Sequence, residues 1–242
     1  MKADEAREIG EQISSLVGSG QGSEAYAQLA RVLNERTPFR LLDRIGETVG
    51  VGPLEAVNGF LQQIAVGRTE GGWVVIGSAL RKQLDRDPAG ALDRCRKYIV
   101  TADVWYGTDI LGERVPGPAF VSDFYPSLAR FAPWRADANR WVRRTVGVAV
   151  HFWAKRRRGA VEYTPQAEKL LSFVEPLFEE REVDAVKGIG WGLKTLARYY
   201  PELVTDWLEL QVVEKQRPHR ALMLHKATTY LSKEQRARLS KG

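Results

Sequence analysis

An internal repeat constrains what this chain can fold into more than any other feature of its sequence. Two stretches match when Arg144 is set over Lys187, an offset of 43 residues. The matched positions are apolar, small or basic in both copies: Val146 with Ile189, Gly147 with Gly190, Val150 with Leu193, Trp153 with Leu196, Ala154 with Ala197, and Lys155 with Arg198. A period of about 40–47 residues is typical of HEAT-like repeats, in which pairs of helices stack. The repeat therefore predicts an all-α, HEAT-like α-solenoid whose inner helices line a concave face.

Helical patterns follow one another along the whole chain, whereas strand signals are scarce. The segment 71–84 contains a strand-like apolar run, but the run continues into a helical pattern and we predict a helix there. The predicted helices cover approximately residues 2–17, 23–35, 38–48, 53–65, 71–84, 88–100, 137–157, 164–178, 182–200, 201 onward, 218–231 and 233–239. We expect them to form a single HEAT-like helical repeat domain over residues 1–242.

Capping signals mark several of these helix starts. Thr37 and Asp87 each precede a proline, which is the pattern of an N-cap followed by the first helical residue. Asp137 is the predicted N-cap of the long helix that follows it. Ser232 and Gln235 have the spacing of a capping box.

The composition is that of an ordinary globular protein with a mild positive excess. Lys and Arg number 36 against 30 Asp and Glu, which gives a net charge of +6 and fits a polyanionic partner. Cys95 is the only cysteine and there are three histidines, so neither an internal disulfide nor a zinc site is expected. The sequence has no apolar run of about 18 residues, and its start does not resemble a signal peptide. We expect a cytoplasmic monomer with no membrane partner, metal or cofactor.

Residues 186–200 form an amphipathic helix when placed on a wheel at about 100° per residue. One stripe is apolar and predicts the core face: Val186, Ile189, Leu193, Leu196 and Tyr200. The opposite arc carries Lys187, Trp191, Lys194 and Arg198. A tryptophan among three cations on the face away from the core is typical of a nucleic-acid surface, where cations meet phosphates and a ring meets sugar or base.

Residues 140–158 repeat this pattern. The core stripe is Val142, Val146, Ala149 and Trp153, and the far face is Arg140, Arg144, His151, Lys155 and Arg158. A basic helix face is ordinarily a solvated surface, but two successive repeats with the same face favour a polyanion site. The glycines at 147, 188, 190 and 192 each cost helix stability of about 1 kcal/mol, which close approach of a neighbouring helix or of DNA would offset.

A third stretch, Val100–Leu111, places a tryptophan and a carboxylate four residues apart. In a helix, Trp105 and Asp109 would share one face, whereas Val104, Leu111 and Val115 would lie on another. An exposed indole beside an exposed acid is unusual. The simpler alternative is a first helical turn with a partly buried tryptophan.

Three motifs together resemble the AlkD-type alkylpurine DNA glycosylases, a family with a HEAT-like fold. They are Val100-Thr101 leading to Trp105-x-x-x-Asp109, then Trp141-Val142-Arg143-Arg144, then Val186-Lys187-Gly188-Ile189-Gly190-Trp191. The resemblance covers roughly residues 98–200, and all four site positions of the family are filled in order. It implies a site made of Trp105, Asp109, Arg144 and Trp191.

The resemblance further implies a DNA repair glycosylase that removes positively charged N3- or N7-alkylated purines from double-stranded DNA by hydrolysis of the N-glycosidic bond. Asp109 would stabilise oxocarbenium character on the deoxyribose and orient the attacking water. Trp105 and Trp191 would pack against the sugar and the cationic nucleotide, and Arg144 would hold a phosphate. Further DNA contacts are expected from Arg140, Arg143, His151, Lys155, Lys187, Lys194 and Arg198. No metal is needed because the leaving base is already activated, and the resemblance implies that this base stays stacked.

Two other functions fit the same features. A non-catalytic HEAT-like DNA-structure-binding protein would use the same basic face, and Asp109 would then be dispensable. An α-solenoid protein-interaction scaffold would bind DNA weakly, with little dependence on salt.

Overall fold

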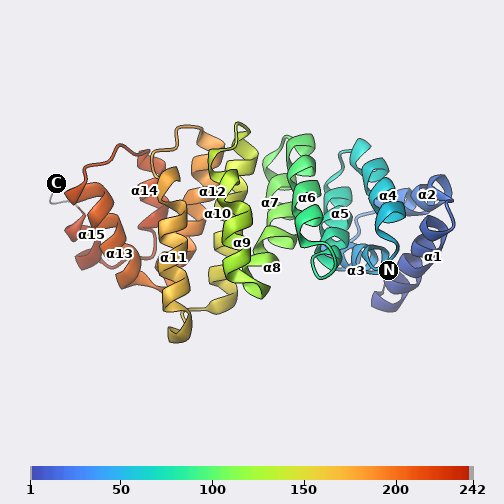
Figure 1. Cartoon of the computed structure of the whole chain (residues 1–242), viewed down its shortest axis with the longest axis horizontal. Helices are drawn as coiled ribbons and strands as arrows, with labels where there is room; N and C mark the ends of the chain where they lie inside the picture. Colours follow the sequence, from blue (N-terminus) through green and yellow to red (C-terminus); the bar gives the residue numbers. More distant parts are fainter. Residues whose placement is uncertain (1, 240–242) are drawn as a thin grey trace. The chain divides into compact units, whose positions relative to one another are not determined.

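The computed structural model describes residues 2–239, and its regular elements in that range are all helices (Figure 1). The α-helices are α1 (Ala3–Gly18), α2 (Gly22–Leu33), α3 (Phe39–Gly50), α4 (Leu54–Val66), α5 (Glu70–Gln83), α6 (Pro88–Ala102), α7 (Trp105–Arg114), α8 (Pro116–Ser122), α9 (Phe124–Phe131), α10 (Arg140–Arg157), α11 (Thr164–Val174), α12 (Val183–Tyr199), α13 (Pro201–Glu209), α14 (Ala221–Ala227) and α15 (Lys233–Arg238). Short helical segments lie between some of them: η1 (Ala132–Ala136), η2 (Val161–Tyr163), η3 (Glu175–Leu177) and η4 (Leu210–Glu214). The all-α prediction is confirmed. Within this part of the chain, no helix is both long and apolar enough to cross a membrane.

Two predicted caps are present as expected. The Asp87 side chain accepts a hydrogen bond from the backbone N–H of Gly90 at 3.0 Å, and Pro88 is the first residue of α6. At α15, Ser232 and Gln235 bond each other's backbone N–H groups, which is the predicted capping box.

Two other caps were predicted wrongly, each by a short shift along the chain. Asn139, not Asp137, caps α10: its side chain accepts from the N–H of Trp141, while Asp137 accepts from the N–H of Asn139. Pro38 occupies the N-cap of α3, and the Thr37 hydroxyl instead donates to the carbonyl of Val32 at the end of α2. At α10, two short polar side chains two residues apart could each cap the helix, so the spacing alone does not decide between them.

Helix α5 shows why its sequence contains a strand-like run. It packs against α3 and α7 in its own layer and against α4 and α6 of the other layer. All residues from Gly72 to Leu80 are consequently buried. A helix that is buried on every side is apolar all round, so its sequence carries little helical periodicity.

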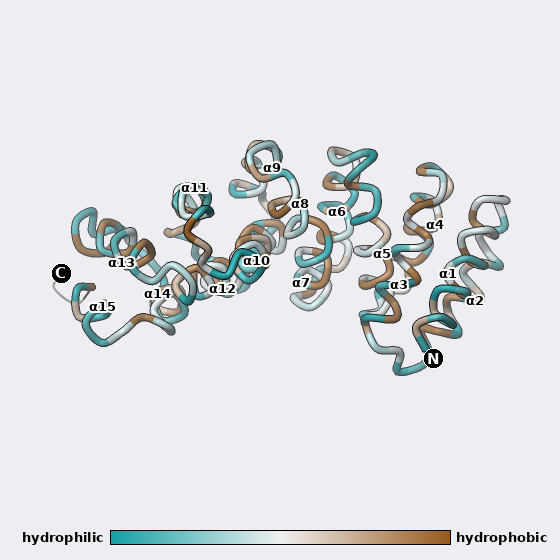
Figure 2. Tube along the Cα trace, turned by 90° about the horizontal axis from the view of Figure 1, so that it is seen from below, coloured by the Kyte–Doolittle hydropathy of each residue, from teal (hydrophilic) through white to brown (hydrophobic). Residues whose placement is uncertain are grey.

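The helices group into two compact units, the first ending at Val115 and the second beginning at Pro116. In the first unit α1, α3, α5 and α7 pack in this order as one layer, and α2, α4 and α6 form the other (Figure 2). In the second unit α8, α10, α12 and α14 pack in order, while α11 and α13 lie in the other layer and α15 packs against α13 (Figure 2). The organisation of residues 1–242 as one repeat domain stays a prediction.

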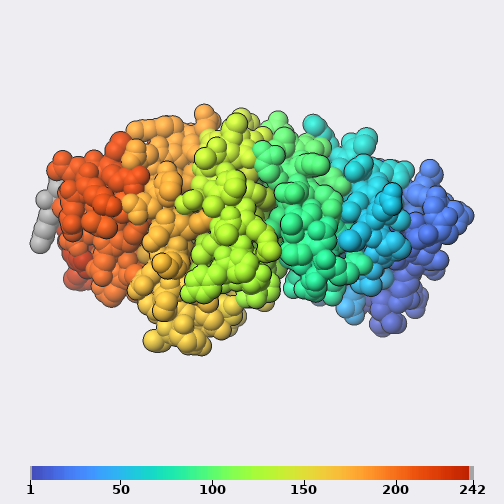
Figure 3. Space-filling model, viewed as in Figure 1, coloured from blue at the N-terminus to red at the C-terminus, as the bar shows by residue number. Residues whose placement is uncertain are grey.

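Within each unit, each helix of a layer packs against the next helix of the same layer. In the space-filling view the residues form bands that follow the sequence order (Figure 3). The two predicted core stripes, Val142 to Trp153 on α10 and Val186 to Tyr200 along α12 and its C-cap, are buried. The offset of 43 residues thus relates two adjacent helices of the same layer, as the HEAT-like repeat predicts.

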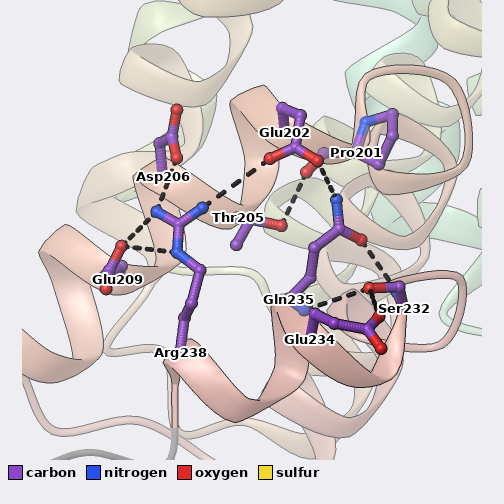
Figure 4. Close-up of polar contacts among 9 residues, drawn as sticks. All are labelled: Pro201, Glu202, Thr205, Asp206, Glu209, Ser232, Glu234, Gln235 and Arg238. Carbon is purple, nitrogen blue, oxygen red and sulfur yellow. Dashed lines mark hydrogen bonds and ion pairs between the residues drawn. The ribbon is translucent and has the colours of Figure 1, made fainter.

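Polar contacts join α15 to α13. Arg238 of α15 bonds Asp206 at 2.7 Å and also pairs with Glu209, both on α13 (Figure 4). Gln235 donates to Glu202 of the same helix at 2.7 Å. These contacts fix α15 against α13 within the second unit.

Candidate functional site

Trp105 stands at the first position of α7 and is strongly exposed. The chain turns sharply before it, because Asp103 takes the left-handed conformation (φ 48°) that ends α6 and Val104 is extended. The indole is 57% exposed and meets the Tyr106 ring edge to face at 5.8 Å. Asp109 lies one helical turn further and is half-buried. Trp105 and Asp109 therefore share a face of α7, as expected, and Trp105 also lies in the first helical turn and is partly buried, as the simpler alternative states.

Helix α7 is anchored at its other end by an ion pair that spans the layer. The Arg114 guanidinium bonds both carboxylate oxygens of Asp43 on α3, with Nε at 2.7 Å from Oδ1. The Ser78 hydroxyl of α5 donates to the same Oδ1 at 2.6 Å. Gly77 leaves room for the stem of Arg114. Three helices thus meet at Asp43, and this holds the helix that carries Trp105 and Asp109.

In the second unit, α10 and α12 pack backbone against backbone. A Cβ at Gly147 would lie 2.1 Å from the carbonyl oxygen of Gly188, and a Cβ at Gly192 would lie 2.6 Å from the carbonyl oxygen of Gly147. We expected close approach of a neighbouring helix or of DNA to offset the helix stability that these glycines cost. The structure shows the close approach of a neighbouring helix. At Gly190 the neighbour is instead the side chain of Lys226, from α14.

Arg144 is buried between these two helices. The wheel predicted it on an outward face, but it is only 7% exposed, because Gly188 leaves space for its stem. Its guanidinium donates to the backbone carbonyl of Asp184 at 3.0 Å. Arg140, one turn earlier, is exposed; it pairs with the Asp184 carboxylate at 3.3 Å and lies over the Trp141 ring.

His151 is likewise buried and serves as a platform for Trp191. The two rings stack with centroids 3.9 Å apart and 26° between their planes. The Thr195 hydroxyl donates to the Trp191 carbonyl at 3.0 Å, so its oxygen accepts from His151 Nδ1 at 2.7 Å. Burial, and secondarily the positive charge of Lys155, lowers the pKa of His151 to about 4. At neutral pH the ring is therefore uncharged, and the predicted outward position of His151 is wrong.

Arg143 is engaged within the protein. Its guanidinium bonds Glu180 at 2.5 Å and the backbone carbonyl of Asp137 at 2.6 Å. Burial alone would raise the pKa of Glu180, but hydrogen bonds from Arg143 and from backbone N–H groups together lower it. This pair ties the start of α10 to the segment before α12, a use that the motif Trp141–Arg144 did not indicate.

The remaining predicted residues lie on the surface of α10 and α12. Lys155, Lys187 and Arg198 are exposed, and Lys194 is half-buried. Two residues that lie beside these cations were not predicted from the sequence: Lys226 on α14, and Tyr230 just after the end of α14. The Tyr230 ring has the Lys194 ammonium at 5.2 Å and the Arg198 guanidinium at 5.3 Å from its centroid. Continuing the wheel analysis into the next helix of the layer was the signal that could have found them.

Comparison with known proteins gives one family match. The sequence matches the family described as DNA alkylation repair enzyme over residues 72–231. No curated protein sequence matches it. Among solved structures, a similar chain is the Pseudomonas fluorescens alkylpurine DNA glycosylase AlkC bound to DNA containing an abasic site analog, with 17% sequence identity and a TM-score of 0.49. That alignment covers 92% of the present chain and 62% of the glycosylase chain.

Proposed function

Because this chain belongs to the family of DNA alkylation repair enzymes, we propose that it is a DNA glycosylase that excises N3- or N7-alkylated purines from duplex DNA. The observation that carries the proposal is the strongly exposed Trp105 with Asp109 one turn along the same helix face. A large exposed indole on an anchored helix has a cost in apolar exposure that a ligand would remove.

Asp109 is the proposed catalytic residue. An N3- or N7-alkylated purine carries a formal positive charge, so its glycosidic bond is already weakened and leaves oxocarbenium character on the deoxyribose. A carboxylate held close to that sugar stabilises the developing cation and orients the attacking water. The bond from C1′ to the base nitrogen breaks, the pair of electrons leaves with the base, and water adds to C1′ and loses a proton. Trp105 would present its electron-rich face to the cationic nucleotide.

The second unit would bind the DNA backbone. Lys187, Lys194, Arg198 and Lys155 supply exposed or half-exposed cations along α10 and α12. Trp191, held by its stack on His151, supplies a ring for the sugar or the base. Arg144 would give a charge-assisted hydrogen bond to a phosphate. Phosphate contacts of this kind position the duplex without reading its sequence.

The proposed reaction needs no metal or cofactor. The positive charge on the alkylated base already weakens the glycosidic bond, as a Lewis acid would otherwise do. Asp109 would stabilise the sugar electrostatically, and the basic surface would position the duplex.

Incubation with duplex DNA that contains a single 7-methylguanine tests the proposal. We expect release of the free base and an abasic site that alkali cleaves. Salt-dependent DNA binding without release of any base would support the DNA-structure binder instead. Weak binding with little salt dependence would support the scaffold.

A further inference from the structure

Two glycines of α12 receive the side chains of two cations from the helices on either side. A Cβ at Gly188 would lie 2.5 Å from Cγ of Arg144 on α10. A Cβ at Gly190 would lie 2.9 Å from Cδ of Lys226 on α14. Both aliphatic stems therefore lie directly on the backbone of α12, which fixes where their charged ends emerge.

Lys187 and Lys194 of α12 lie three residues before and four residues after Gly190, so they share the face of α12 on which the Lys226 stem lies. Burial lowers the pKa of Lys226, and the positive charges of Lys194, Arg144 and Lys187 lower it further. Positive charges near a lysine disfavour its charged form and lower its pKa in this way. We name Arg144, Lys187, Lys194 and Lys226 the cation cluster. Three helices contribute to it, and the other three cations repel Lys226 in the free protein.

Tyr230 holds one side of the cluster in place. Its half-exposed ring lies near both the Lys194 ammonium and the Arg198 guanidinium, at 5.2 Å and 5.3 Å. A ring shared by two cations partly offsets their repulsion and restricts where their long side chains extend. The positions of these cations are therefore fixed by packing on the α12 backbone and on the Tyr230 ring, whereas isolated surface lysines have no such contacts.

We propose that the cation cluster binds one phosphate group of the DNA backbone between α12 and α14, next to Trp191, and that Lys226 is a phosphate-binding residue of this enzyme. The inference rests on the proposed function, since it takes duplex DNA as the polyanion. A phosphodiester would neutralise the repulsion among the four cations, so an arrangement that destabilises the free protein becomes favourable in the complex. It also places a phosphate contact on a helix beyond the stretch that carries the family motifs.

Lys226→Met tests the proposal, because methionine keeps an unbranched stem over Gly190 and removes the charge. With an undamaged duplex, the slope of log affinity against log salt should become shallower by about 0.9, the value of one phosphate contact. The melting temperature of the free protein should rise, because repulsion within the cluster is relieved. Lys226→Arg keeps the charge and should keep the parental slope. Lys169→Met, on an exposed lysine of α11, is the matched control and should leave the slope unchanged.

The outcomes separate this inference from the proposed function. A parental salt slope in Lys226→Met overturns the phosphate site and leaves the glycosylase proposal intact, since release of 7-methylguanine is measured independently. A fall in the melting temperature of Lys226→Met overturns the proposed repulsion. Failure of the parent protein to bind duplex DNA overturns both proposals.

Discussion

Gly147 of α10 faces Gly188 of α12 so closely that a Cβ on Gly147 would lie 2.1 Å from the Gly188 carbonyl oxygen. No side chain, however small, fits between these two backbones. The tight contact is what allows the stem of Arg144 to lie over Gly188 and the ring of His151 to reach Trp191. The glycines therefore serve the geometry of the basic surface, at the expense of intrinsic helix stability.

Gly147→Ala should lower the free energy of unfolding by about 2–3 kcal/mol, because the added methyl group forces two buried helix backbones apart. Gly59→Ala on α4 is the control: a Cβ there has no atom within 4 Å, so alanine should stabilise the helix by about 0.5–1 kcal/mol. Chemical denaturation of both variants measures the difference. Equal stability of the two variants would contradict the backbone contact.

Asp109→Asn should slow base excision about a hundredfold, equivalent to on the order of 3 kcal/mol of transition-state stabilisation. The substitution keeps the size of the side chain and deletes the charge, so DNA binding should be undiminished or stronger. Single-turnover release of 7-methylguanine and a separate binding titration give the two values. Asp103→Asn, which removes a nearby acid at a left-handed position that asparagine tolerates, should excise at the parental rate. Parental excision by Asp109→Asn would return the protein to a DNA-binding role.

Arg144→Ala should weaken binding to unrelated duplex sequences alike and make the salt slope shallower by about 0.9, because a lost phosphate contact carries no base information. Arg36→Ala, on an exposed arginine between α2 and α3, should change neither quantity. Arg144 also donates to the Asp184 carbonyl, so Arg144→Ala loses this contact and should be less stable. The titrations should therefore be done well below the melting temperature of the variant. Unchanged affinity would remove Arg144 from the DNA surface.

The stability of the protein should fall as the pH drops from about 6.5 to about 4, through the buried His151. Above this window the ring is neutral in the folded and unfolded states. Within it the unfolded chain binds a proton that the folded protein does not, so unfolding becomes easier by about 3 kcal/mol in total. His151→Asn keeps an N–H donor near Thr195 and should flatten this part of the profile. His225→Asn, on an exposed histidine of α14, should leave the profile unchanged.

The sequence by itself determined most of the helices and the core faces of α10 and α12, whereas α8 and α9 lie in a proline-containing stretch where no helix was predicted. The stripes Val142 to Trp153 and Val186 to Tyr200 are buried as the wheels predicted. The helical period is set by the local backbone, so the residues that share a face are known before the helix packs. The family was also predicted from sequence, since its motifs are short runs of consecutive or nearly consecutive residues. Trp105 on an exposed face followed from the same local periodicity.

Only the tertiary structure decided what lies on the flanks of each helix. A wheel distinguishes the core from the opposite face, but a helix inside a stacked layer also touches a neighbour on each side. Arg144 and His151 are buried for this reason, although they lie away from the core stripe. Lys226 packs on Gly190 of α12, more than thirty residues earlier in the sequence. No local sequence pattern indicates that Gly190 leaves room for this side chain. Contacts between helices depend on how closely two backbones approach, and that distance is set by the packing of the whole unit.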